Sequence, residues 1–198
     1  MSLYDRDIRA LIHAHLAPRK ADGAIVLDEM GIYWGEVRCD VAAIDDRLSG
    51  WEIKSDHDSL ARLPIQSMMY GYVFDDMTIA AGDKFVRRAA DHVPDWWGIV
   101  RVTSAVETVR ECRPNPCQDA FHLAALLWRE ELVTLLANAD LDKGWRSKPK
   151  PTLCRRVADT MAVECARRDV LAAIRRRVGW PEEQRSKPRP SVAARATA

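Results

Sequence analysis

The sequence places a carboxylate and an amine two residues apart in a short, otherwise apolar segment, GWEIKS at 50–55. If this segment is a strand, its side chains alternate, so Glu52 and Lys54 point to one face and Trp51 and Ile53 to the other. Burying either charge without a partner would cost several kcal/mol. The burial of this pair therefore needs an explanation, and two are available. Either it is a structural ion pair, or it belongs to a metal site with a catalytic lysine.

The segments around this pair indicate an α/β fold. Apolar residues at helical spacing predict an amphipathic helix near the N-terminus, and three apolar segments joined by short turns then predict a meander of strands. Pro64 is best tolerated in the first turn of a following helix. The predicted order is helix 4–17, strands 24–34, 36–45 and 50–55, helix 64–74, strand 77–82, helix 83–93 and strand 96–103. This order describes a layered α/β core.

The pattern changes after Pro114 and Pro116. Helices are expected over 117–139, 152–161 and 165–178, with a basic loop over 141–151, and the residues from Pro181 on carry too little apolar surface to fold. We therefore expect three parts: a core over 1–110, a basic helical region over 117–180 and a disordered tail over 181–198.

The net charge of +1 hides a strong asymmetry. Residues 1–142 hold 24 Asp and Glu against 15 Lys and Arg, whereas residues 143–198 hold 15 Lys and Arg against 5 Asp and Glu. An acidic body with a basic end is typical of nucleic-acid binding, because phosphate contacts come from Lys and Arg. The candidate phosphate contacts are Lys143, Arg146, Lys148, Lys150, Arg155 and Arg156. The helix–loop–helix order over 129–161 faintly resembles a SAP-type DNA-binding module; a winged-helix fragment and a helical cap packed on the sheet remain alternatives.

Composition favours a globular cytoplasmic protein. The chain is 47% hydrophobic and 30% charged, which suits one folded domain. No apolar run approaches the roughly 18 residues that a membrane span needs, and the acidic N-terminus does not look like a signal peptide. The five cysteines form no CxxC pair, so free thiols in a reducing compartment are expected.

Asp40 makes the Glu52–Lys54 pair chemically interesting. It lies on the preceding predicted strand, and in a hairpin it could face the same side as Glu52 at a neighbouring position. Paired carboxylates hold Mg²⁺, which lowers the pKa of a bound water and neutralises charge on a scissile phosphate. A neighbouring lysine can orient the attacking hydroxide and stabilise the transition state. This arrangement suits phosphodiester hydrolysis.

Asp40, the EIK triplet at 52–54 and their strand–strand–helix setting resemble the PD-(D/E)XK nuclease superfamily. Gln66 and Tyr70 match the QxxxY motif of its RecB-like branch, and their spacing places both on one helix face. The resemblance covers 5–103 and extends to a set of bacterial and phage proteins assigned to that superfamily. One departure is Cys39, which stands where the motif's name expects Pro.

The resemblance implies a restriction-endonuclease-like core and a role for each matching residue. Asp40 and Glu52 would be metal ligands, Lys54 the catalytic lysine, and Glu29 a further ligand or water-positioning acid. Gln66 and Tyr70 would contact substrate or form the edge of the site.

We therefore expect a Mg²⁺-dependent deoxyribonuclease, with Mn²⁺ as a substitute metal, that acts as an endonuclease rather than an exonuclease. DNA repair, defence and mobile-element biology are the expected settings. The alternative is a non-catalytic DNA-binding or adaptor protein that keeps the fold. RNA remains an open alternative substrate. A homodimer would suit a double-strand cutter, although no residue indicates one.

Overall fold

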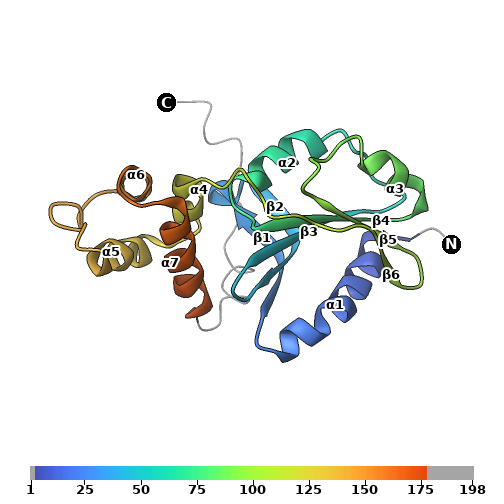
Figure 1. Cartoon of the computed structure of the whole chain (residues 1–198), viewed down its shortest axis with the longest axis horizontal. Helices are drawn as coiled ribbons and strands as arrows, with labels where there is room; N and C mark the ends of the chain where they lie inside the picture. Colours follow the sequence, from blue (N-terminus) through green and yellow to red (C-terminus); the bar gives the residue numbers. More distant parts are fainter. Residues whose placement is uncertain (1–2, 178–198) are drawn as a thin grey trace.

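The computed structural model of the chain describes residues 3–177. Within these residues, six strands form one sheet in the order β1-β2-β3-β4-β5-β6 (Figure 1). The strands are β1 Ile25–Ile32, β2 Val37–Ile44, β3 Leu48–Lys54, β4 Asp76–Ala81, β5 Gly98–Val102 and β6 Val106–Arg110. The pairs β3–β4 and β4–β5 are parallel, and the remaining pairs are antiparallel. The predicted α/β class is therefore confirmed.

Helices cover both faces of the sheet. Figure 1 shows α1 (Asp5–Ala21) on one face and α2 (Leu63–Gly71) with α3 (Asp83–Ala89) on the other. The C-terminal helices gather beside the β1–β2 end of the sheet: α4 (Ala120–Ala125), α5 (Arg129–Asn138), α6 (Lys150–Thr160) and α7 (Val163–Arg175). A short 3-10 turn, η1 (Tyr33–Gly35), connects β1 to β2.

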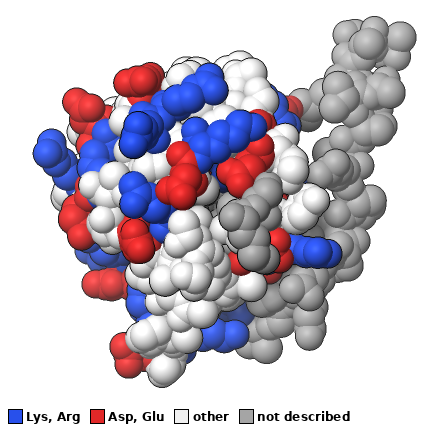
Figure 2. Space-filling view, turned by 90° about the vertical axis from the view of Figure 1, so that its right-hand side faces the viewer, with Lys and Arg blue, Asp and Glu red and all other residues white. Residues whose placement is uncertain are grey.

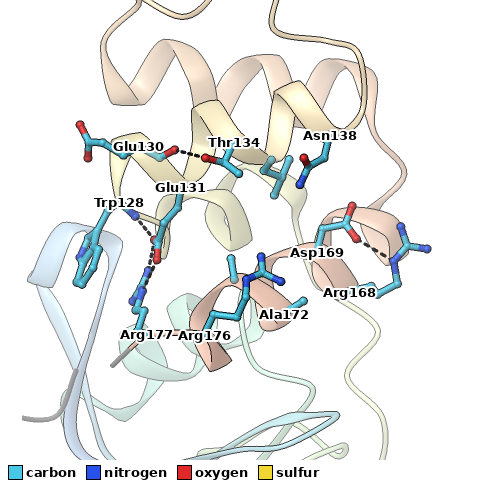
Figure 3. A pocket seen from close by; sticks show the side chains of 12 residues that line it. Trp128, Glu130, Glu131, Thr134, Asn138, Arg168, Asp169, Ala172, Arg176 and Arg177 are labelled. Atoms are coloured by element: carbon cyan, nitrogen blue, oxygen red, sulfur yellow. Dashed lines mark hydrogen bonds and ion pairs between the residues drawn. The ribbon is translucent and has the colours of Figure 1, made fainter. Parts of the chain in front are cut away.

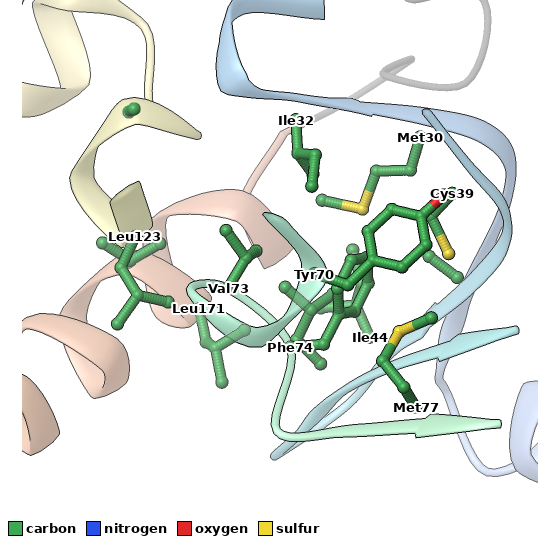
Figure 4. Close-up of a cluster of buried hydrophobic side chains, with 14 of the residues drawn as sticks. Met30, Ile32, Cys39, Ile44, Tyr70, Val73, Phe74, Met77, Leu123 and Leu171 are labelled. Atoms are coloured by element: carbon green, nitrogen blue, oxygen red, sulfur yellow. The ribbon is translucent and has the colours of Figure 1, made fainter. Parts of the chain in front are cut away.

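The sheet separates two hydrophobic cores. Trp51 and Ile53 face the core beneath α1, where they pack with Ile8 and Ile12. The core on the opposite face is larger and runs without interruption from α2 into the C-terminal helices. Figure 4 shows Tyr70 and Phe74 of the α2 region in the same cluster as Leu123 and Leu171, and all of them are buried. The C-terminal helices therefore complete the core of the sheet.

The predicted order of the first eight elements is confirmed, and several predictions need correction. The helix expected over 4–17 continues through Pro18 to Ala21. The strand β6 was not predicted, because its sequence VETVR is mostly exposed and lacks a buried apolar face. The helix expected over 83–93 ends at Ala89. The helix expected over 117–139 is two helices, because the backbone N–H of Trp128 donates to the Glu131 carboxylate at 2.7 Å and starts a new helix there.

Among the residues that the structure describes, no helix is long and apolar enough to cross a membrane. The tail predicted over 181–198 lies outside the described residues.

Candidate functional site

The strand β3 places Glu52 and Lys54 side by side on the α2 face of the sheet. Both are buried, with 1% and 5% of their surface exposed. The Lys54 Nζ donates to the Glu52 Oε1 at 2.6 Å. The predicted sharing of one face is thus confirmed, and the charges are paired. Because the parallel neighbour β4 covers the other edge of β3, this pair sits in the middle of the sheet.

The helix α2 adds two donors to the same carboxylate. Pro64 occupies its first turn, and the spacing of Gln66 and Tyr70 brings both to the face that meets Glu52. The Gln66 Nε2 donates to the Glu52 Oε1 at 2.8 Å, and the Tyr70 hydroxyl lies 2.7 Å from Oε2. Each oxygen of the buried carboxylate therefore has a donor.

Tyr70 joins the site to strand β2. Its hydroxyl also lies 2.6 Å from the backbone carbonyl of Arg38, so its one proton lies between two acceptors. Burial, together with the negative charge expected on Cys39 and Glu52 when they ionise, raises the pKa of Tyr70 far above its ordinary value. The phenol consequently stays protonated and acts as a donor.

Asp40 lies where β2 and β3 separate. The pairing of these strands ends at Val41 and Trp51, and beyond this point the Asp40 Oδ2 accepts the backbone N–H of Ile53 at 2.6 Å. Asp40 therefore fills the gap between the strands instead of pairing across them. Burial and then the charge of Glu52 raise its pKa to about 7, against a smaller lowering by the Ile53 hydrogen bond. An ionised Asp40 would therefore add a second negative charge near Glu52 in a buried position.

Glu29 is held on the α1 side by Arg9. The Arg9 Nη2 lies 3.0 Å from the Glu29 Oε1 and 3.9 Å from the Asp40 Oδ1, and its Nη1 lies 3.4 Å from Asp28. The Glu29 side chain is 48% exposed, whereas Glu52 is buried on the α2 side. Sequence reasoning did not find Arg9, which is 31 residues from Asp40 and carries no local signal.

The three expected carboxylate ligands are not assembled as one group. Over residues 3–177, no cluster of three or more His, Cys, Asp or Glu side chains could hold a metal ion. Two carboxylates are nevertheless enough for Mg²⁺, which keeps several waters and commonly takes one or two from the protein. Burial and then the charge of Glu52 raise the pKa of Asp40, and a cation beside these two carboxylates would favour the ionised form of Asp40. These two residues fit such an ion, and Glu29 remains outside the set.

The six basic residues expected to contact phosphate differ in their surroundings. Lys143, Arg146, Lys148 and Arg155 are exposed. Lys150 instead donates to the backbone carbonyl of Ala125 at 2.8 Å, and the Arg156 guanidinium lies 4.9 Å from the Trp145 ring centroid. Lys150 and Arg156 thus hold the helices together, whereas the exposed four face solvent. At the opposite end of the molecule, near β6, Lys and Arg are interleaved with Asp and Glu (Figure 2).

A separate pocket of about 650 Å³ lies between α5 and α7 (Figure 3). Its charged walls are largely paired with each other, because Arg177 binds Glu131 at 2.6 Å and Arg168 binds Asp169 at 2.8 Å. None of the predicted site residues lines it. The pocket is therefore not part of the Glu52 site.

Comparisons with known proteins match the chain to one described family. A family model described as Bacteriophage P4 protein cII matches residues 2–186. Protein cII of Enterobacteria phage P4 is 33% identical over 87 residues, which is 44% of this chain and 33% of that protein. The chain thus spans about a third of the length of the curated relative it matches. No solved structure gives a significant match.

Proposed function

The chain belongs to the Bacteriophage P4 protein cII family, and from its site we propose that it is a Mg²⁺-dependent nuclease that hydrolyses DNA phosphodiester bonds. The family description gives a phage protein and no activity, so the support comes from the residues of the site. One observation carries the proposal. Lys54, Gln66 and Tyr70 converge on Glu52 while the Asp40 carboxylate lies beside it in the gap between β2 and β3.

The fold supports the same proposal. The order of helix, three-stranded meander, helix, strand, helix and strand is the one implied by the resemblance to PD-(D/E)XK nucleases. The acid on β2 and the carboxylate–lysine pair on β3 stand where two neighbouring strands separate. A restriction-endonuclease-like core is therefore part of the proposal, and a phage family fits mobile-element biology.

Each residue of the site would have a distinct task. Asp40 and Glu52 would hold the metal, which when bound supplies an acidified water and charge neutralisation. Lys54 would keep its ammonium beside the scissile phosphate and stabilise the charge that develops there. Gln66 and Tyr70 would fix the orientation of Glu52. Since Lys54 and Gln66 both donate to the Glu52 Oε1, that oxygen must exchange at least one donor when the site is loaded.

A second function is favoured by the completeness of this network. Both Glu52 oxygens are satisfied by protein donors, which is also what a purely structural ion pair requires. A non-catalytic DNA-binding or adaptor protein would keep this network for stability. The exposed basic residues of 143–155 would then be its working surface.

Cleavage of supercoiled plasmid and of labelled single-stranded DNA, with Mg²⁺, Mn²⁺ or EDTA, separates the two functions. The variants are Lys54→Ala and Asp40→Asn, with the exposed Lys20→Ala on α1 as a matched control. Asp40→Asn is included because Lys54→Ala leaves Glu52 buried without its cation, which could unfold the chain.

We expect metal-dependent cutting by the wild type and by Lys20→Ala, and loss of cutting in both site variants while circular dichroism shows Asp40→Asn folded. Wild-type protein that cuts neither DNA with either metal, yet binds DNA in a salt-sensitive way, would identify the adaptor function instead.

A further inference from the structure

Five aromatic rings form a cluster on the surface where the β1–β2 connection meets α4. Its members, called here the aromatic platform, are Tyr33, Trp34, Tyr72, Phe121 and His122. His122 is stacked on Tyr72 at 4.5 Å and on Tyr33 at 5.8 Å between ring centroids. Trp34 lies 5.1 Å from Tyr33 and 5.8 Å from Phe121. None of the five rings is fully buried, so the platform presents aromatic surface to solvent.

The backbone beneath the platform is strained. Tyr33 and Trp34 have φ values of 48° and 57°, in the left-handed region that residues with a Cβ rarely adopt. This conformation does not serve to bury the tryptophan, because Trp34 remains 37% exposed. A costly backbone that keeps a large ring at the surface points to a role for that ring outside the fold.

A positive charge accompanies the rings. The guanidinium of Arg155, on α6, lies 4.8 Å from the Phe121 ring centroid and is exposed. At the other end of α4, the Lys150 side chain binds the backbone carbonyl of Ala125. Ala125 lies about 6 Å along the helix from Phe121. The exposed Lys148 lies two residues before Lys150 in the chain. Aromatic faces beside Arg and Lys are what single-stranded nucleic acid requires, with bases stacked on rings and phosphates on cations.

The platform lies on the same side of the sheet as Glu52. Tyr72 and Phe121 pack against the core on the α2 face, and Tyr70 of the same core contacts Glu52 through its hydroxyl. The strand β2 begins at Val37, shortly after η1, and Asp40 comes three residues later, which is about 10 Å of strand. A strand of nucleic acid that meets the platform would thus reach the candidate site within a few nucleotides.

We propose that the aromatic platform stacks an unpaired base of a DNA strand, with Trp34 as the exposed stacking ring and Arg155 as a phosphate contact. This inference rests on the proposed function in taking DNA as the ligand, and deepens it by naming a single-stranded segment as the part recognised. Stacking accepts every base, so the platform would bind without sequence preference.

The test is the affinity of the full chain for fluorescein-labelled oligothymidylate and for a labelled duplex of the same length. Fluorescence anisotropy in EDTA at one fixed salt concentration measures binding without cleavage. Trp34→Asn removes the ring while supplying a residue that tolerates the left-handed backbone, and Trp34→Phe keeps a ring. The matched control is Tyr4→Ala, since Tyr4 is 54% exposed and stacks on His57 outside the platform.

We expect Trp34→Asn to raise the Kd for oligothymidylate by about fivefold or more, with a smaller change for the duplex. Trp34→Phe and Tyr4→Ala are expected to bind close to wild type. Arg155→Gln should lower the slope of log affinity against log salt by about 0.7, the value for one phosphate contact on a single strand.

If Trp34→Asn binds oligothymidylate with the same affinity as wild type, the proposal is wrong. The platform would then be a contact surface for a protein. An equal loss on single strand and duplex, or an equal loss in Tyr4→Ala, would also overturn the proposal. Because these affinities are measured without metal, they are independent of cleavage. A chain that binds as expected and never cuts DNA would refute the nuclease and keep the platform.

Discussion

Glu52 is a carboxylate buried in the middle of a sheet, and three side chains converge on it. Removing one partner of such a network costs more than the lost hydrogen bond, because the remaining group stays buried without compensation. Lys54 balances the charge, while Gln66 and Tyr70 satisfy the remaining hydrogen-bonding capacity. The network thus stabilises the fold whatever chemistry it performs.

The substitution Tyr70→Phe tests how much one hydroxyl group of this network contributes to stability. The substitution keeps the buried ring and removes the hydroxyl that contacts Glu52 and the Arg38 carbonyl. We expect the free energy of unfolding to fall by about 1–3 kcal/mol, measured by urea denaturation. The control is Tyr72→Phe on a half-buried ring, for which a change within about 0.5 kcal/mol is expected. If Tyr70→Phe and wild type have the same free energy of unfolding, the hydrogen bonds of the Tyr70 hydroxyl do not stabilise the fold.

Asp40 makes the stability of the fold depend on pH. Its pKa of about 7 lies above the ordinary value of 3.8, because burial and Glu52, with a smaller part from Glu29, disfavour the charge more than Lys54 and the Ile53 N–H favour it. The folded chain therefore binds this proton more tightly than the unfolded chain. The resulting stability is complete below about pH 4 and is lost as pH rises through about 7.

Asp40→Asn removes this dependence and can still accept the Ile53 N–H. We expect the variant to be more stable than wild type at pH 8 by on the order of 2 kcal/mol, with the difference vanishing toward pH 4. Urea titrations between pH 4 and pH 8 measure it. In the same series, MgCl2 should raise the Tm of wild type at pH 8 and leave that of Asp40→Asn unchanged. Parallel pH profiles for the two proteins would refute this account of Asp40.

At the scale of elements, β3 is the strand around which the site is built, and all seven of its residues are buried. At Gly50, side chains from both neighbouring strands and from the layer above fill the space where a Cβ would stand. A Cβ there would clash with the Met77 Sδ of β4 and lie 3.0 Å from the Cys39 Sγ of β2 and from the Phe74 ring. Packing at this position therefore leaves no room for a methyl group.

Gly50→Ala is therefore expected to lower the free energy of unfolding by about 1–3 kcal/mol through overpacking. Gly71→Ala in α2 is the matched control, since its Cβ would meet neighbours at an ordinary 3.8 Å and alanine favours a helix. We expect this control to be neutral or more stable. Thermal unfolding followed by circular dichroism compares the two, and a Gly50→Ala chain as stable as wild type would contradict the packing argument.

Elements whose signal is local were predicted from the sequence. Strand alternation was enough to place Glu52 and Lys54 on one face, and helical spacing to place Gln66 and Tyr70 together. The Trp128 cap was missed because a helix-forming pattern continues through it. Arg9 and the aromatic platform were also missed, since each depends on residues brought together from distant parts of the chain. Local periodicity carries no information about such contacts.

At the scale of the whole molecule, the C-terminal helices are tied to the sheet by Asp75. This buried carboxylate accepts the Leu48 N–H at 2.7 Å, the Gln118 amide at 3.0 Å and the Arg167 guanidinium at 3.0 Å. Together with the continuous core, these bonds cross the boundary expected between 1–110 and 117–180. We therefore expect the described chain to unfold as one unit.

Arg167→Ala tests this coupling. It leaves Asp75 without its cation, so we expect a loss of about 2–4 kcal/mol and a single transition seen at the same urea concentration by tryptophan fluorescence and by circular dichroism. The neighbouring Arg168 is exposed and pairs only locally with Asp169, so Arg168→Ala should leave stability unchanged. Two separate transitions in the wild type would show that the C-terminal helices fold independently.

The buried Glu52–Lys54 pair on β3 also limits how the sequence of this protein can evolve. Substituting Glu52 or Lys54 alone leaves the other charge buried without a partner inside the sheet. Both residues would therefore have to change, and the single variant between the two changes would be unstable and removed by selection. If the proposed DNA cleavage were lost in a descendant, Glu52, Lys54, Gln66 and Tyr70 would still be needed for stability. Asp40 is the opposite case, because a neutral residue there removes the cost of burying an ionised carboxylate near Glu52. Loss of the proposed activity would then first be visible as a neutral residue at position 40.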